Sequence, residues 1–170
     1  MRLFVILCIL AISLLIGQEK DKEPYQEVEF KTLTSYELPL EVTYFAEKNQ
    51  IGLVKKAIPK KVKQLNGQKV KIKGFMVPVT YDKDYHVTGF LFAPDRNSCC
   101  FGQIPNLNGF IFSTAKEGVK NLKDNLIEVT GTLYTEPKFY EKEECVLIYK
   151  MDIDSVKKIE YRGTKKGFPF

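Results

Sequence analysis

The second half of the chain consists of short apolar segments in which polar residues recur at every second position. The clearest segment follows Asn66-Gly67, where Val70 and Ile72 alternate with lysines. Alternation with a period of two is typical of a strand with one buried face, and Asn-Gly is a favoured turn. Similar patterns predict four further strands, at residues 87–93, 108–113, 126–135 and 145–153, the last of them continued by 156–161.

Glycines inside two of these strands narrow the fold class. Gly74 lies in the first strand and Gly131 in the fourth, where a residue without a side chain lets a strand coil around a barrel. Five antiparallel strands with such bends predict a mostly β protein, a small OB-like five-stranded barrel with an irregular N-terminal extension. The alternative is a β-sandwich that includes the N-terminal strands.

The N-terminal part changes composition several times. A positive start and the apolar run from Leu3 to Ile16 have the shape of a secretory signal, and the run is short for a membrane-spanning helix. One or two short strands are expected within residues 28–45 and a short helix within 47–62. The predicted organisation is a signal peptide or anchor (1–17), a spacer (18–27), an N-terminal extension (28–65), the barrel (66–161) and a tail (162–170).

The chain is basic, with 26 Lys and Arg against 21 Asp and Glu. Most of the excess lies in a row of lysines with no acidic residue among them. Such a row could attract the phosphates of nucleic acid or of anionic lipid, although a solvated face is the simpler interpretation. For an exported protein a membrane surface is the preferred partner of the two. The row comprises Lys55, Lys56, Lys60, Lys61, Lys63, Lys69, Lys71 and Lys73.

Three cysteines lie outside the leader, and Cys99 and Cys100 are adjacent. A bond between neighbours needs a strained ring, so the leading interpretation is a disulfide from either of them to Cys145. Three reduced, buried thiols are the first alternative. The second is a zinc or copper(I) site in which His86 joins the three thiols, although adjacent side chains of an extended chain point to opposite sides.

His86 is the only histidine, which excludes a multi-histidine metal centre. The chain also lacks a nucleophile elbow and a Gly-rich phosphate loop. These absences favour a non-catalytic protein, so no catalytic residue is assigned. No cofactor is expected apart from the zinc or copper of the alternative site.

Seven sequence blocks follow one another in an order that resembles a family of exported bacterial proteins of unknown function, often encoded beside ABC-type transporter components. The resemblance covers residues 60–155 and implies a periplasmic location and a small β-barrel-like domain, with no established activity. The blocks are Leu65-Asn66-Gly67-Gln68-Lys69-Val70, Gly74-Phe75-Met76-Val77-Pro78, Phe90-Leu91-Phe92-Ala93-Pro94, Cys99-Cys100-Phe101-Gly102, Pro105-Asn106-Leu107-Asn108, Val129-Thr130-Gly131-Thr132-Leu133 and Ile148-Tyr149-Lys150-Met151.

The resulting expectation is an exported, non-catalytic binding or accessory protein of a periplasmic transport or envelope system. It is expected in the periplasm or outside the cell, or at the inner membrane if the leader is not cleaved. Its partners would be envelope or transport components. One alternative is a metal-handling or thiol-redox protein, and another is an OB-type binder of oligonucleotides or oligosaccharides. The expected binding loop, residues 95–108, contains Phe101, Gly102, Pro105, Asn106 and Asn108.

Overall fold

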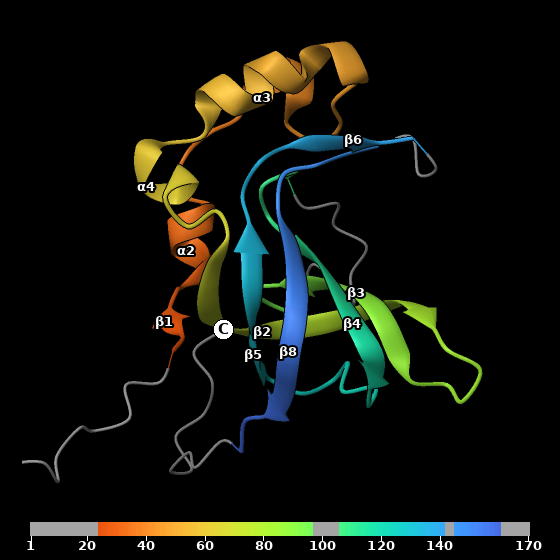
Figure 1. Cartoon of the computed structure of the whole chain (residues 1–170). Helices are drawn as coiled ribbons and strands as arrows, with labels where there is room; N and C mark the ends of the chain where they lie inside the picture. Colours follow the sequence, from red (N-terminus) through yellow and green to blue (C-terminus); the bar gives the residue numbers. More distant parts are fainter. Residues whose placement is uncertain (1–23, 97–105, 142–144, 161–170) are drawn as a thin grey trace, which may run out of the picture.

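Five strands form a closed barrel in the computed structural model, which describes residues 24–96, 106–141 and 145–160 (Figure 1). The strands are neighbours in the order β2-β3-β4-β8-β5, and pairing of β2 with β5 closes the ring. The predicted OB-like five-stranded barrel is therefore confirmed. Its strands are β2 (Gln68–Tyr81), β3 (Val87–Ala93), β4 (Ile111–Val119), β5 (Ile127–Tyr134) and β8 (Lys150–Lys158).

The last strand, β8, lies between β4 and β5. It runs parallel to β4 and antiparallel to β5, whereas the other neighbouring pairs of the ring are antiparallel. The expectation of five antiparallel strands was wrong for a geometric reason. Five strands in a closed ring cannot reverse direction at every step, so one neighbouring pair must be parallel.

Two of the expected strands have other boundaries in the structure, and the first strand is long. β2 is 14 residues long and continues past Pro78 to Tyr81. Its register with β3 shifts on either side of Thr80, so a bulge follows the proline. β4 begins and ends later than the expected 108–113. The expected fifth strand is divided, because its first residues form β7 (Cys145–Leu147), which pairs with β6 (Lys138–Tyr140) in a separate two-stranded sheet.

The N-terminal extension is mainly helical. The expected short strands within 28–45 were wrong, because helix α2 and the 3-10 helix η1 occupy this stretch after the short strand β1. The expected helix within 47–62 is present as three short helices, and Pro59, which cannot donate a backbone hydrogen bond, separates the last two. Their bounds are β1 (Gln26–Glu27), α2 (Phe30–Leu33), η1 (Leu40–Val42), η2 (Lys48–Gln50), α3 (Ile51–Ala57) and α4 (Lys60–Lys63).

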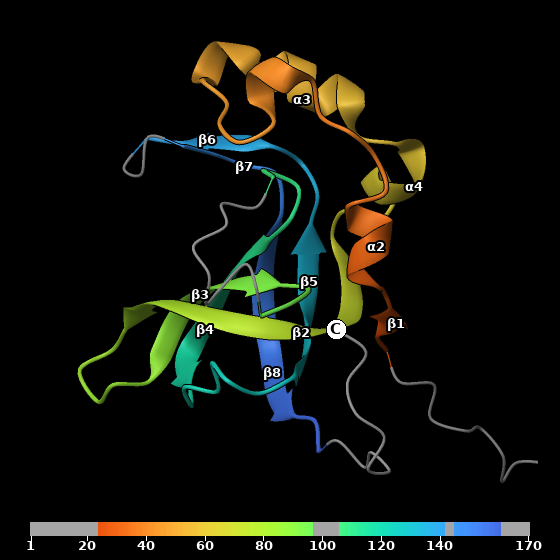
Figure 2. The ribbon, with the colours of Figure 1, turned by 180° about the vertical axis from the view of Figure 1, so that it is seen from behind.

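Residues 48–63, which we call the helical cap, lie across one end of the barrel, above the β6–β7 hairpin (Figures 1 and 2). Val54 and Val62 of the cap are buried in the same hydrophobic core as Ile72 and Phe90 of the barrel. The cap is therefore a packed part of the fold. Within the described ranges, no helix combines the length and the apolar character needed to cross a membrane.

The extension also packs closely against β2. Phe30 of α2 lies edge-on to Phe92, with 5.2 Å between ring centroids. A Cβ atom at Gly74 would lie 2.8 Å from a ring carbon of Phe30 and 2.5 Å from the carbonyl oxygen of Ala93. Gly74 thus permits this close approach, in addition to any effect on strand curvature.

Candidate functional site

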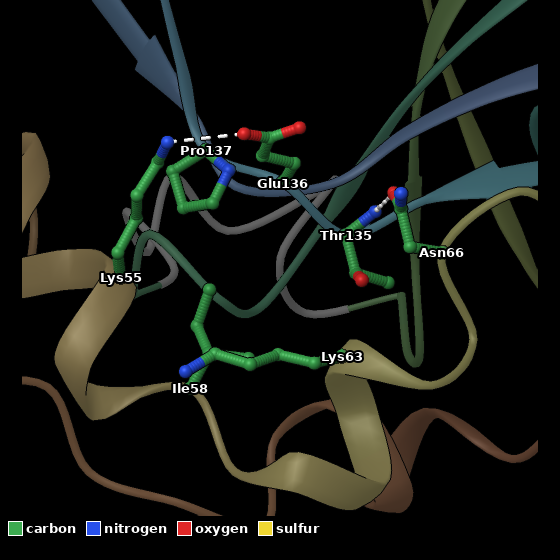
Figure 3. A pocket seen from close by; sticks show the side chains of 7 residues that line it. All are labelled: Lys55, Ile58, Lys63, Asn66, Thr135, Glu136 and Pro137. Carbon is green, nitrogen blue, oxygen red and sulfur yellow. Dashed lines mark hydrogen bonds and ion pairs between the residues drawn. The ribbon is translucent and has the colours of Figure 1, made fainter.

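A cavity of about 330 Å³, here called the cap cavity, lies where the helical cap meets the end of β5 (Figure 3). Its walls come from two segments that are far apart in the sequence: the cap with the turn that follows it before β2, and the residues that follow β5. The volume is within the range of small-molecule sites. The lining residues are Lys55, Ile58, Lys63, Asn66, Thr135, Glu136 and Pro137.

A second cavity of about 450 Å³, here called the hairpin cavity, shares Asn66 and Glu136 with the first. It lies between the β5–β8 pair and the β6–β7 hairpin. The two cavities are neighbours, and we call them together the cleft. The other residues of the hairpin cavity are Tyr134, Lys138, Tyr140, Leu147, Lys150 and Asp152.

Thr135 is the unusual residue of the cap cavity. Its side chain is only 2% exposed, and its Oγ1 has no hydrogen-bond partner in the part of the chain that the structure describes. The side chain points toward the part of the cap that carries Ile58 and Lys63 (Figure 3), while its backbone N–H donates to Asn66 Oδ1 at 2.9 Å. An unpaired buried hydroxyl costs about 1–3 kcal/mol and is rare. Its place in a cavity wall marks it as a group that could bind a ligand.

The charged groups of the cleft are only partly paired. Lys55 Nζ lies 3.0 Å from Glu136 Oε1, and this hydrogen bond holds the pKa of the Glu136 carboxyl below its usual value. Lys150 Nζ similarly lies 3.1 Å from Asp152 Oδ1. Lys63 in the cap cavity and Lys138 in the hairpin cavity have no ion pair among the described residues. Each cavity therefore offers one paired and one unpaired ammonium group.

The predicted binding loop is described only at its ends. Cys99, Cys100, Phe101, Gly102 and Pro105 lie outside the described residues, so their predicted roles stay predictions. Asn108 is buried, and its Nδ2 donates to the carbonyl oxygen of Tyr36 at 3.0 Å. Asn106 and Asn108 line a separate cavity of about 430 Å³ beside η1.

The structure does not bring His86 and Cys145 together. His86 lies in the turn before β3, with Nδ1 3.3 Å from Asp82 Oδ2. Val87, the residue after His86, pairs with Val119 at the last position of β4. Cys145 begins β7, which lies near the other end of β4, where Phe112 pairs with Lys150 of β8. No group of three or more His, Cys, Asp or Glu side chains suited to a metal occurs within 24–96, 106–141 and 145–160. A disulfide or metal site that uses Cys99 and Cys100 remains a prediction.

The lysine row divides into two parts. On β2, Lys69 pairs with Asp154 and Lys73 pairs with Glu27, as expected of a solvated strand face. The cap lysines beyond Lys55 have no ion pair in the described ranges, and one of them lines the cap cavity. Sequence reasoning missed the role of Thr135, because only closure of β2 on β5 brings it to Asn66.

The fold and the cleft define a small closed β-barrel protein with a helical cap and a ligand-sized cavity. The chain belongs to the family described as "Protein of unknown function (DUF3299)", which matches residues 15–158. It is similar to a crystal structure of a DUF3299 family protein from Pseudomonas aeruginosa, at 21% identity and a TM-score of 0.57, over 82% of this chain and 99% of that one. This similarity shows the fold. A comparison with curated proteins gave no match. The expected membership of a family of unknown function is thus confirmed.

Proposed function

We propose that the protein is an exported, non-catalytic binding protein whose ligand occupies the cap cavity. The observation that supports this most directly is the buried hydroxyl of Thr135, which points into a cavity and has no partner in the described structure. The ionisable groups around it are two lysines and a carboxylate that is already paired. This set can hold a ligand by hydrogen bonds and charge, and neither a histidine nor a cysteine lines the cavity.

The proposed place of action is the cell envelope. The leader-like segment at residues 1–17 supports export, and the resemblance described above implies that related proteins are often encoded beside ABC-type transporter components. An exported binding protein would meet its ligand outside the cytoplasm. We therefore propose membrane transport or envelope components as its partners.

A ligand screen on the full chain, recovered from the periplasm, tests the proposal. The melting temperature would be measured with each compound for the wild type, Thr135→Val and a control, Thr88→Val, whose hydroxyl lies in the distant β2–β3 hairpin. A ligand should raise the melting temperature of the wild type and the control, and raise that of Thr135→Val much less. Equal stabilisation of all three would place the site elsewhere, and chemical turnover of the ligand would overturn the non-catalytic role.

A further inference from the structure

We propose that the ligand carries an anionic group, a carboxylate or a phosphate, and that this group binds in the cap cavity, whose wall includes Thr135 and Lys63. The inference rests on the proposed function, since it takes the cap cavity as the ligand site. It goes further by naming the chemistry that the cavity selects. Three independent features of the cavity support it: unused hydrogen-bond donors, local charge, and the apolar remainder of the wall.

The unused hydrogen-bonding capacity of the cap cavity consists largely of donors. Asn66 Oδ1 already accepts the backbone N–H of Thr135, which leaves the two N–H groups of the amide. The Thr135 hydroxyl and the Lys63 ammonium add further donors without a described acceptor. Of the described lining side chains, Glu136 carries the one carboxylate, and its Oε1 accepts a hydrogen bond from Lys55 Nζ. A ligand that pairs with these donors must supply hydrogen-bond acceptors.

The charge around the cavity favours the same ligand. Lys55 and Glu136 offset each other, whereas the charge of Lys63 is not offset within the described residues. No acidic residue occurs anywhere between Lys48 and Lys73. Positive side chains around a partly apolar cavity concentrate anions there. Hydrogen bonds to a charged acceptor are also stronger than those to a neutral one.

The rest of the wall constrains the group attached to the anion. Ile58 and Pro137 are both buried and apolar, so they favour an uncharged carbon framework next to the anionic group. A larger framework could continue past Glu136 into the hairpin cavity, where Tyr134 and Tyr140 line the wall. Inorganic phosphate would then be a minimal ligand, and a larger phosphate ester or carboxylic acid a better one.

The test uses the full chain with inorganic phosphate, glycerol 3-phosphate and uncharged glycerol as soluble probes. Affinity would be measured by calorimetry and the site located from the backbone amide NMR shifts of Asn66 and Thr135. The variants are Lys63→Gln and Thr135→Val. Lys61→Gln is the matched control, because it removes the same charge from the same helix but lies outside the cavity lining. Thr88→Val controls for loss of a hydroxyl.

We expect both phosphates, but not glycerol, to shift the Asn66 and Thr135 signals. Lys63→Gln and Thr135→Val should each weaken glycerol 3-phosphate binding about tenfold, since each removes a donor to a charged group. Lys61→Gln and Thr88→Val should change it less than about twofold, because screening limits the effect of a distant exposed charge. Equal losses in Lys61→Gln and Lys63→Gln would overturn the proposal and indicate only general attraction by surface lysines.

Two further outcomes separate the inference from the proposed function. A neutral ligand that binds at Thr135 as tightly as a phosphate would overturn the anion inference and leave the proposed function in place. If phosphate shifted the amide signals only of residues outside the cleft, and no other ligand bound in the cleft, both the anion inference and the proposed function would be overturned. Phosphatidylglycerol vesicles, compared with phosphatidylcholine vesicles, distinguish the source of the anion. If the protein binds phosphatidylglycerol vesicles and both Thr135→Val and Lys63→Gln weaken this binding selectively, the anion is a lipid headgroup. If it binds soluble phosphate esters alone, the anion belongs to a free metabolite.

Discussion

The N-terminal extension contacts the barrel in several places, and two of these junctions differ in how completely their buried polar groups are paired. At the first junction, Tyr149 donates its hydroxyl to the carbonyl oxygen of Leu33 at 2.8 Å. The hydroxyl of Tyr36 lies 2.8 Å from that of Tyr149 and donates to it, because the Tyr149 proton is already used. At the second junction, the cap cavity, the hydroxyl of Thr135 is equally buried and has no described partner.

The contrast separates a structural contact from a site. Burial raises the pKa of Tyr149 far above its ordinary value, so its hydroxyl remains a donor at every physiological pH. Each group of this first junction has its partner inside the protein, and the junction needs nothing else. The cap cavity belongs to the same extension and the same core but leaves its donors unused. Unpaired polar groups in an otherwise well-paired fold are expected where function requires them.

The largest expected effect is at the first junction. Tyr149→Ala should lower the free energy of unfolding by about 3–5 kcal/mol, because it removes a fully buried ring. Tyr149→Phe keeps the ring but leaves the Leu33 carbonyl without its donor, for an expected loss of about 1–3 kcal/mol. Denaturant unfolding measures both. Tyr85→Phe, at an 84% exposed position, is the control and should have no effect. Wild-type stability of Tyr149→Phe would contradict a structural role for this hydrogen bond.

At the second junction, removal of the buried hydroxyl should raise the free energy of unfolding, the opposite of its effect at the first. Thr135→Val replaces an unpaired buried hydroxyl by a methyl group of similar size, so the ligand-free protein should gain about 1 kcal/mol of stability. Thr130→Val is the matched comparison on β5, the strand that Thr135 directly follows, since the Thr130 hydroxyl is bonded to Ser155 Oγ at 2.9 Å. It should lose about 1 kcal/mol. The two variants would be compared by denaturant unfolding without ligand, and equal losses in both would argue against an unpaired Thr135.

The smallest expected effect concerns the ion pair at the edge of the cap cavity. Both Lys55 and Glu136 are about half exposed, and exposed pairs contribute little, so Glu136→Gln should barely change the denaturation midpoint at pH 7. Because the folded-state pKa of Glu136 is lowered, the contribution of its charge is present above the unfolded value of 4.5 and is lost as the pH falls through the folded pKa.

Glu136→Gln should therefore lose slightly less stability than the wild type on acidification. Midpoints measured at neutral pH and below pH 4.5 would show the difference. Glu141→Gln, which breaks the exposed pair with Lys48 outside the cleft, is the control and should behave alike. A large loss for Glu136→Gln at pH 7 would mean that this pair holds the cap in place.

The barrel could be predicted from the sequence because alternation reports local burial directly. β3 has the bounds that its pattern indicated, and the alternating lysines correctly indicated the solvated face of β2. Local pattern fails where a structure is too short to show a period. Phe30 and Leu33 are buried from a single helical turn, which their spacing alone could not distinguish from an irregular strand.

The candidate site could not be predicted, because its parts meet only through long-range pairing. Lys63 and Thr135 are brought to one cavity when β2 pairs with β5, and no local pattern encodes that pairing. The rare residues of the sequence, its cysteines and its single histidine, do not line the cap cavity. The candidate site consists instead of common residue types, and only an unmet hydrogen bond distinguishes Thr135 from the other threonines.

The insertion of β8 between β4 and β5 has a consequence for how the chain acquires its structure. The strand made last fills the gap between two earlier ones, and its contacts with β4 join residues 38 positions apart, as between Thr114 and Asp152. Until residues 150–158 arrive, β4 and β5 each present an unpaired edge, and edges of this kind invite aggregation. Non-local pairing is also slow. A chain that lacks β8 would therefore have two open edges facing each other.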